Sequence, residues 1–174
     1  MGRASQEQAR RNRERVVATA SRMFREQGTH VSVAELMKAA GLTHGGFYKQ
    51  FASKEALVDE ATAHAFGELA GRYDDVAQRA LIDGYLSVEH RDAPADGCPV
   101  AGLASDMARD DGGDEAHRTY AEGVADFAAR LATDGEDGIA RLCTMVGALV
   151  LARAVKDSPL SERILDTARD ELTR

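Results

Sequence analysis

The segment from Val31 to Leu57 constrains the fold of this chain more than any other. Its first half carries apolar residues at the spacing of one helical face, namely Val33, Leu36, Met37 and Ala40. Ser32 can cap the start of this helix, and Glu35 follows it at the position that completes a capping box. Gly41 is expected to end the helix, because glycine takes the left-handed conformation of a helix end without steric cost.

A second short helix is expected directly after this turn. Thr43 can cap it, and Phe47 and Phe51 would form its buried face. Tyr48 lies beside that face, and Ser53 can cap the helix that follows. Two short helices joined by a glycine-containing turn form a helix-turn-helix unit, whose second helix enters the major groove of DNA.

The same residues resemble the recognition segment of the TetR family of bacterial transcriptional regulators. The resemblance covers Thr43 to Phe51, Ser53 to Leu57 and Ala39 to Leu42, and in the preceding helix Val17, Ala20, Phe24 and Gly28. Two positions depart from the family pattern. Gln50 stands where histidine is commoner, which could alter a contact with DNA, and Met37 stands where alanine is usual, which should change only packing.

The resemblance implies which residues contact DNA: Thr43, His44, Gly45, Tyr48, Lys49 and Lys54. Tyr48 and Lys54 are expected to touch phosphates and so to position the protein. Thr43, His44 and Lys49 are expected to sense bases. For Tyr48 there is an alternative, in which its ring packs beneath Phe47.

The distribution of charge agrees with contact between DNA and one end of the chain. Residues 1–54 hold ten Lys and Arg against four Asp and Glu, whereas the remaining 120 residues hold twelve against 25. A basic part attached to an acidic part can meet a polyanion with one end and repel it with the other. Alternatively, Arg10, Arg11, Arg13 and Arg15 solvate one exposed helix.

The remaining sequence predicts an all-α fold of about nine helices, because no stretch shows sustained alternation of apolar and polar residues. Outside the helix-turn-helix unit we expect helices at 6–27, 54–73, 75–89, 99–108, 115–131, 137–155 and 160–172, with a loop at 90–97 and a break at 110–114. Residues 1–53 would form the helix-turn-helix DNA-binding domain, and residues 54–174 the effector-binding and dimerisation domain.

The stretch from Tyr85 to Asp106 resembles one TetR subgroup, in which it lies beside the effector cavity. Pro99 suits the first position of a helix and leaves Cys98 near the N-cap, where the positive helix end would lower the pKa of the thiol. Some relatives sense electrophiles or oxidants with a cysteine in this region. The alternative is that Cys98 is a small buried residue, the role expected for Cys143.

A cavity for an apolar or aromatic effector is expected among the helices predicted between residues 54 and 155. It would be bounded by apolar and amphipathic residues on their inward faces: Phe66, Leu69, Tyr85, Cys98, Leu103, Met107, Tyr120 and Phe127.

The last two helices are expected to form the interface of a homodimer. The run from Met145 to Ala152 is apolar on nearly every side, and such a helix must be buried all round. In TetR proteins the two final helices pair with those of a second subunit. The resemblance places Met145, Gly147, Ala148, Leu151, Ala152 and Ile164 at this interface. The alternative is an ordinary core helix within a monomer.

Enzyme, metal and membrane functions have little support in the sequence. It contains no phosphate-binding glycine loop, no GxSxG and no HExxH, and its five histidines lack the spacing of metal ligands. We therefore expect neither catalysis nor a metal or cofactor. The longest apolar run, Leu142 to Ala152, is too short to cross a bilayer, and the two cysteines with no export signal indicate the reducing cytoplasm.

These observations predict a homodimeric, ligand-responsive transcriptional regulator, most simply a repressor. It would bind a palindromic operator in double-stranded DNA and release it when a small molecule binds. Two alternatives stay open. One is a redox or electrophile sensor that acts through Cys98, and the other is an interaction protein that kept the fold but not DNA binding.

Overall fold

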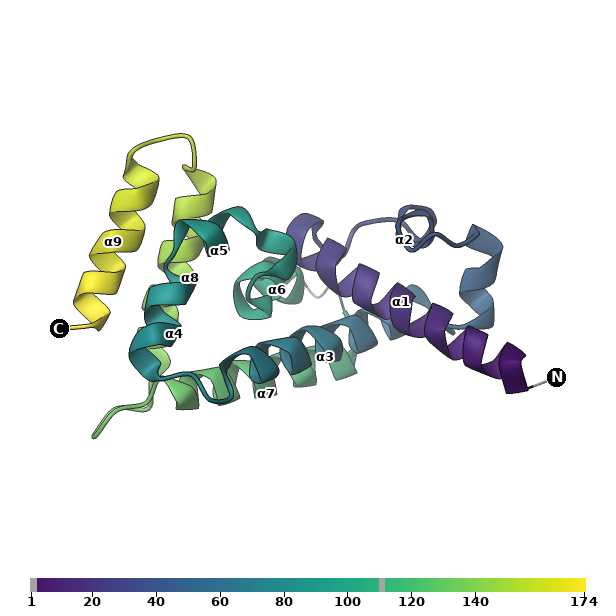
Figure 1. Cartoon of the computed structure of the whole chain (residues 1–174), viewed down its shortest axis with the longest axis horizontal. Helices are drawn as coiled ribbons and strands as arrows, with labels where there is room; N and C mark the ends of the chain where they lie inside the picture. Colours follow the sequence, from purple (N-terminus) through teal and green to yellow (C-terminus); the bar gives the residue numbers. More distant parts are fainter. Residues whose placement is uncertain (1–2, 110–111) are drawn as a thin grey trace.

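The computed structural model describes residues 3–109 and 112–174, and within these residues the chain forms nine α-helices and two short 3₁₀ helices (Figure 1). In chain order they are α1 (Arg3–Gln27), α2 (Val33–Ala39), η1 (His44–Lys49), α3 (Lys54–Tyr73), α4 (Gln78–Tyr85), α5 (Val88–Asp92), η2 (Pro94–Asp96), α6 (Pro99–Ala108), α7 (Asp114–Arg130), α8 (Ile139–Ala154) and α9 (Leu160–Leu172). The described residues contain no β-strand, only an isolated bridge between Thr133 and Glu136. The predicted all-α fold is confirmed.

The helices form an elongated molecule whose two ends come from different parts of the chain (Figure 1). The first end, which we call the head, consists of α1, α2 and η1. At the opposite end α8 packs against α9 beside the C-terminus. Between the ends, α3 and α7 run side by side, and α6 lies between α1 and α8. Because α3 follows directly after η1, it connects the head to the rest of the molecule, which we call the body.

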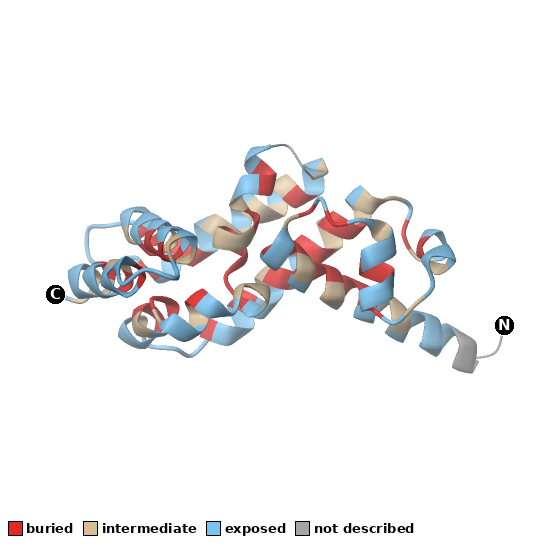
Figure 2. Ribbon diagram, turned by 90° about the horizontal axis from the view of Figure 1, so that it is seen from above, coloured by how far each residue is buried: buried red, intermediate tan, exposed pale blue. Residues whose placement is uncertain are grey.

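Two hydrophobic cores fill the interior, and buried positions occur along the whole length of the molecule (Figure 2). The body core joins α3, α4, α6, α7, α8 and α9. The head core joins α1, α2, η1 and the start of α3, but it also contains Leu103 and Met107 of α6 and Ala116 of α7. Helix α3 begins at Lys54, as predicted, yet the head core extends beyond residue 53. The boundary between the domains therefore stays a prediction.

The helix predicted at 75–89 is divided in the structure, and the loop predicted at 90–97 is partly helical. Leu86 leaves the helical conformation, and Ser87 caps α5 by accepting the N–H of His90 at 3.1 Å. The Ser87 hydroxyl also donates to the Gly84 carbonyl at 2.8 Å, which fixes the corner. Pro94–Asp96 then form η2. A serine that can cap a helix ends the preceding helix here, against the apolar periodicity that predicted a continuous one.

The other predicted helices are observed close to their expected bounds. Helices α3, α6 and α9 occupy the predicted spans, and α1, α7 and α8 start and end within three residues of them. Residues 110–111 of the predicted break lie outside the described residues. Between α7 and α8 the chain turns at Gly138, whose φ is +79°. A Cβ atom there would lie 2.0 Å from the Ala128 carbonyl oxygen, so this corner requires glycine.

Candidate functional site

The capping box predicted at the start of α2 is present. The Ser32 hydroxyl accepts the N–H of Glu35 at 3.3 Å, and the Glu35 carboxylate accepts the N–H of Ser32 at 2.9 Å. The Ser32 hydroxyl also donates to the Glu35 carboxylate at 2.6 Å, and this bond, followed by the one from the backbone N–H of Ser32, lowers the pKa of Glu35. At the other end, Gly41 takes a φ of +70° and turns the chain toward η1. Local contacts therefore define both ends of α2.

The recognition segment is a 3₁₀ helix rather than the predicted α-helix. Its backbone bonds span three residues, as between the N–H of Gly46 and the carbonyl of Thr43 at 3.0 Å. Glycine has a low α-helical propensity, and Gly45 and Gly46 make up two of the six residues of this segment. An α-helix would therefore be only weakly stable here. Thr43 is its N-cap residue but makes no side-chain capping bond, contrary to expectation.

Two aromatic rings attach this segment to the head. Phe47 and Phe51 are buried and stack with ring centroids 5.4 Å apart. The Arg13 guanidinium of α1 lies 4.8 Å above the Phe51 ring and is paired with Glu60 of α3. One arginine thus holds the recognition segment between α1 and α3.

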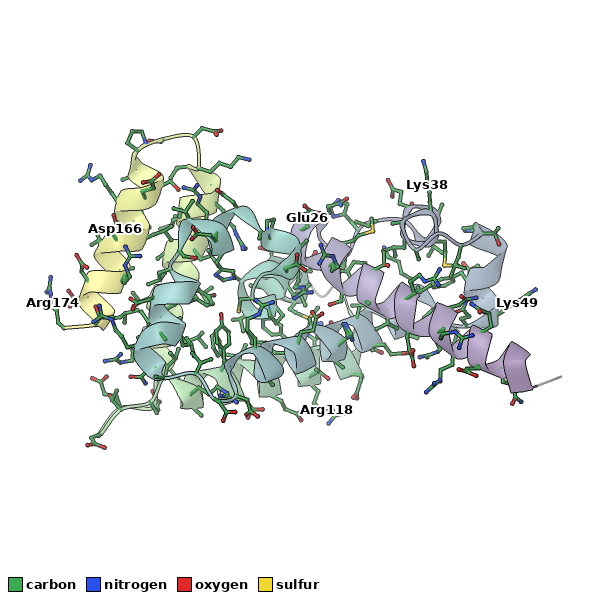
Figure 3. All side chains as sticks on the ribbon, viewed as in Figure 1. Glu26, Lys38, Lys49, Arg118, Asp166 and Arg174 are labelled. Atoms are coloured by element: carbon green, nitrogen blue, oxygen red, sulfur yellow. The ribbon has the colours of Figure 1, made fainter. Side chains whose placement is uncertain are left out.

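The side chains predicted to contact DNA lie mostly on the outer surface of this segment. Thr43, His44, Gly45, Tyr48 and Lys49 are exposed, and Lys54 is half-buried at the start of α3. Figure 3 shows Lys49 pointing away from the protein at the end of the head. Tyr48 is 68% exposed although its ring meets the edge of Phe47. The Gln50 amide donates to the Gly46 carbonyl at 3.4 Å and is therefore turned toward its own segment.

The residues predicted to line an effector cavity are distributed over both cores. Leu103 and Met107 belong to the head core, whereas Leu69, Tyr85, Cys98 and Phe127 belong to the body core. Phe66 and Tyr120 are half-buried, and their rings meet edge to face with centroids 5.8 Å apart. The structure thus does not bring all eight residues around one space.

Three of the eight residues line a hollow of about 60 Å³ between α3 and α7: Phe66, Leu69 and Phe127. Ala70, Gly123 and the polar side chains of Asp126 and Arg130 complete its wall. The Phe66 ring rests on the backbone of α7 at Gly123, where an added Cβ atom would lie 2.2 Å from the ring. The missing side chain at residue 123 therefore allows the ring to lie between the two helices.

Cys98 is the N-cap residue of α6, as the sequence suggested, but its thiol does not have the lowered pKa that we expected. The side chain is buried, and burial raises the pKa of the thiol above its usual value. Tyr85 and the backbone amides of Val100 and Ala101 act in the opposite direction, but their effect is smaller. Desolvation of the thiolate outweighs the positive helix end.

His90 links the backbone of Cys98 to that of Tyr85. Its Nδ1 lies 2.7 Å from the Tyr85 carbonyl oxygen, and its Nε2 accepts the N–H of Cys98 at 3.1 Å. This pairing requires a proton on Nδ1 and a neutral ring. Burial lowers the pKa of His90 to about 4, in agreement with that state. The buried Tyr85 hydroxyl lies beside the Cys98 thiol and lowers the pKa of that thiol, and it makes no hydrogen bond to a nitrogen or oxygen atom among the described residues.

One face of α8 is buried within the chain, and the opposite face is exposed. Met145, Ala148 and Ala152 are buried, whereas Gly147 is exposed and Leu151 is 58% exposed. Ile164 of α9 is half-buried, and beside it a groove of about 410 Å³ lies between α8 and α9. Met145 and Ala152, seven residues apart, share the inward face, so they pack within the protomer.

The expectation that Cys143 packs in the interior is wrong. Its side chain is exposed, because it lies on the same outward face of α8 as Gly147 and Leu151. Apolar residues occur on all sides of α8, so their spacing did not indicate which side packs against the core.

No group of three or more potential metal ligands occurs within the described part of the chain. His90 and Cys98, which could in principle share a zinc ion, use both ring nitrogens of the histidine for backbone contacts instead. Within residues 3–109 and 112–174, no helix is long and apolar enough to cross a membrane.

An all-α fold with an exposed helix-turn-helix unit at one end defines the class of helical DNA-binding regulators. The model of the bacterial regulatory proteins of the tetR family matches residues 16–61, which include α1 from Val16 onward, α2, η1 and the start of α3. Residues 16–61 of this chain therefore match the DNA-binding part of the TetR family of regulators. No curated protein matches it in sequence.

Solved structures show the same fold over nearly the whole chain. The reduced form of NemR from E. coli is 18% identical with a TM-score of 0.76, over 93% of this chain and 95% of that chain. A TetR transcriptional regulator from Chloroflexus aurantiacus J-10-FL is 19% identical with a TM-score of 0.68, over 95% and 94%. AibR, solved with isovaleryl coenzyme A and operator DNA, is 16% identical with a TM-score of 0.57, over 92% and 97%.

Proposed function

We propose that this protein is a ligand-responsive repressor that binds a palindromic operator as a homodimer and releases it when a small molecule binds. The observation that carries the proposal is the recognition segment. His44, Tyr48 and Lys49 are presented to solvent, while Phe47 and Phe51 anchor the segment in the head core. This arrangement supports insertion of the segment into a major groove.

The exposed face of α8 supports assembly into a homodimer. Leu151, Val150 and Leu160 are large apolar residues exposed at the end opposite the head. A second copy of the same surface, related by a twofold axis, would cover them and place two recognition segments on one duplex. Of the predicted interface residues, Gly147, Leu151 and Ile164 have the exposure that this arrangement needs.

The hollow between α3 and α7 carries three of the predicted effector residues, but at about 60 Å³ it would have to widen to admit an apolar or aromatic effector. Phe66, Leu69 and Phe127 provide its apolar wall. A ligand there would act on α3, which begins at Lys54 beside the recognition segment. The mechanism requires only that the effector bind the DNA-released arrangement better than the DNA-bound one, with a coupling free energy of about 1–3 kcal/mol. AibR was solved with both a ligand and operator DNA.

Selection from random-sequence duplexes tests this proposal. We expect the protein to enrich a palindrome with half-sites about one helical turn apart, in complexes that contain two chains. Affinity should fall linearly with salt concentration on a logarithmic plot. The enriched duplex, placed at a promoter, should lower reporter expression in the presence of the protein. Failure to enrich any duplex at low salt would contradict DNA binding and leave the interaction protein as the working alternative.

A thiol sensor that acts through Cys98 is the second candidate. The observation that favours it is the Tyr85 hydroxyl beside the thiol, since a hydroxyl can stabilise a thiolate. One protein of the same fold was solved in a form described as reduced. Cys98→Ser and Cys143→Ser provide a matched pair, because only the first residue is buried at the start of α6. Release of DNA by N-ethylmaleimide from Cys143→Ser but not from Cys98→Ser would support the sensor, and equal release from both would reject it.

A further inference from the structure

Arg25 of α1 connects three parts of the molecule that are far apart in sequence. Its side chain is only 1% exposed. The guanidinium donates to the carbonyl of Ser21 in α1 at 3.1 Å and to that of Gly97, directly before α6, at 3.0 Å. A third bond, at 2.7 Å, reaches the carboxylate of Glu68 in α3. A single buried cation thus contacts the head, the connecting helix α3 and the body.

The same end of α1 meets α6 at two further points. Gly102 of α6 packs so closely that an added Cβ atom would lie 3.1 Å from the backbone of Arg25. Four residues after Gly102 in α6, the buried Asp106 carboxylate accepts the N–H and the hydroxyl of Thr29 at 3.3 and 3.1 Å. Outside these buried contacts, Arg22 pairs with Asp96 at the surface. The segment from Asp96 to Asp106 is therefore held along the last two turns of α1.

A guanidinium suits this position better than an ammonium would. It is planar and presents several N–H groups in fixed directions, so it can serve three acceptors that lie in different helices and loops. A buried charge is tolerated only where its partners remain in place, since removing one of them leaves the charge uncompensated. The position of Gly97 is therefore linked energetically to the positions of α1 and α3.

We propose that Arg25 is a positioning residue that fixes the DNA-binding head to the segment Asp96–Asp106, so that a change in either is transmitted to the other. The inference rests on the proposed DNA binding. In the proposed function the effector acts on the head through α3. Here the body also acts on α1 directly. Cys98 and the start of α6 lie inside the connected segment, so either kind of effector could use this route.

Hydrogen exchange tests the inference without knowledge of the effector. Coupling between two sites is reciprocal, so bound duplex should slow exchange in the distant segment. The amides of Cys98 and Gly102 are suitable reporters, because they bond to His90 Nε2 and to the Cys98 carbonyl. We expect the duplex enriched by the wild type to slow their exchange by about fivefold or more.

Arg25→Met removes the guanidinium and keeps the apolar stem, and Arg118→Met is the matched control. Arg118 is an arginine of α7 whose side chain is 60% exposed and points into solvent (Figure 3). We expect protection at Cys98 and Gly102 to disappear in Arg25→Met and to persist in Arg118→Met. Arg25→Lys is the second variant, for the case in which Arg25→Met does not fold. The lysine ammonium cannot donate to the Gly97 carbonyl and the Glu68 carboxylate with the geometry of a guanidinium. Protection of the Cys98 and Gly102 amides should therefore fall by at least about half.

The outcomes separate the two proposals. If no duplex is enriched, the proposed function fails before Arg25 is tested. If duplex binds but the wild type shows no protection at Cys98 and Gly102, the role of Arg25 is overturned. Equal protection in the wild type and in the folded Arg25 variants overturns it as well.

Discussion

The carboxylate of Asp59 in α3 accepts the backbone N–H of Ala116, at the start of α7, at 3.0 Å. Helix α7 begins after Gly113, which has no side chain to cap it. An added Cβ atom at Gly113 would lie 3.1 Å from the same carboxylate. A residue 57 positions earlier therefore supplies the cap that the local sequence lacks.

Removal of this cap should destabilise the protein. We expect Asp59→Ala to lower the free energy of unfolding by about 1 kcal/mol, the usual effect of losing a helix N-cap. Urea unfolding followed by circular dichroism measures the change. Asp75→Ala, at an exposed position between α3 and α4, serves as the control and should leave the midpoint unchanged. Equal midpoints for the two variants would argue against the cap.

Buried Tyr85 and half-buried Tyr120 should respond differently to loss of their hydroxyl groups. The Tyr120 hydroxyl donates to the Val100 carbonyl at 2.7 Å, whereas the Tyr85 hydroxyl meets only the thiol of Cys98, a weak hydrogen-bonding group. Tyr120→Phe should therefore cost about 1 kcal/mol of unfolding free energy, while Tyr85→Phe should be neutral or stabilising at pH 7. Thermal unfolding of both variants compares them. A large loss in Tyr85→Phe would reveal a partner for its hydroxyl.

His90 should make the protein sensitive to mild acid. Burial lowers its pKa from 6.5 to about 4, so in the folded state it stays neutral where the unfolded chain already binds a proton. Its contribution to stability is complete above pH 6.5 and decreases, by at most about 3 kcal/mol, as the pH falls toward 4. Urea unfolding between pH 7 and 5 should show a smaller decrease for His90→Gln. His30→Gln, at an exposed position, should follow the wild type.

Lys54 and Gly45 probe two kinds of contact with DNA. Lys54→Ala should weaken binding to specific and random duplexes alike and reduce the salt slope by about one unit. Lys156→Ala, exposed at the other end of the molecule, is its control.

Gly45→Ala tests whether the backbone of the recognition segment approaches DNA closely. The added Cβ atom would have no protein atom within 4 Å, so a loss of affinity would come from contact with DNA. Unchanged affinity in both Lys54→Ala and Gly45→Ala would remove these residues from the interface.

The two faces of α8 should give opposite results when charged. Leu151 is exposed, so Leu151→Glu should yield a folded monomer whose DNA binding is weakened. Met145 is fully buried in the body core, so Met145→Glu should prevent folding instead. Sedimentation and circular dichroism distinguish the two results. A Leu151→Glu protein that sediments as the wild-type dimer would place the interface elsewhere.

Local sequence determined much of what could be predicted. The capping box of Ser32 and Glu35, the turn at Gly41 and the buried pair Phe47 and Phe51 depend on neighbours in the chain, and all three are observed. Residues whose partners are distant could not be found in this way. Arg25 and Asp59 occur on helices as charged residues that a sequence would assign to solvent, and only the packing of α1, α3, α6 and α7 gives them partners.

The burial of individual side chains was the other source of error. Cys98 was placed correctly at the start of α6, but its chemistry depends on burial by residues from other helices, which no local pattern reports. The apolar composition of α8 likewise predicted contact on all sides, and only the structure separates buried Met145 from exposed Cys143. Which residues bind an effector or a second subunit stays a prediction.

The head core, which includes Leu103, Met107 and Ala116, has a consequence for protein engineering. The parts that would read DNA and respond to ligands are distinct in position but share one interior. Exchanging residues 1–53 for those of another regulator would leave these three side chains against a foreign surface. Each large apolar residue that lost its packing would cost about 1.5–3 kcal/mol. A functional chimera would therefore need the junction residues of α6 and α7 to be transplanted together with the foreign head.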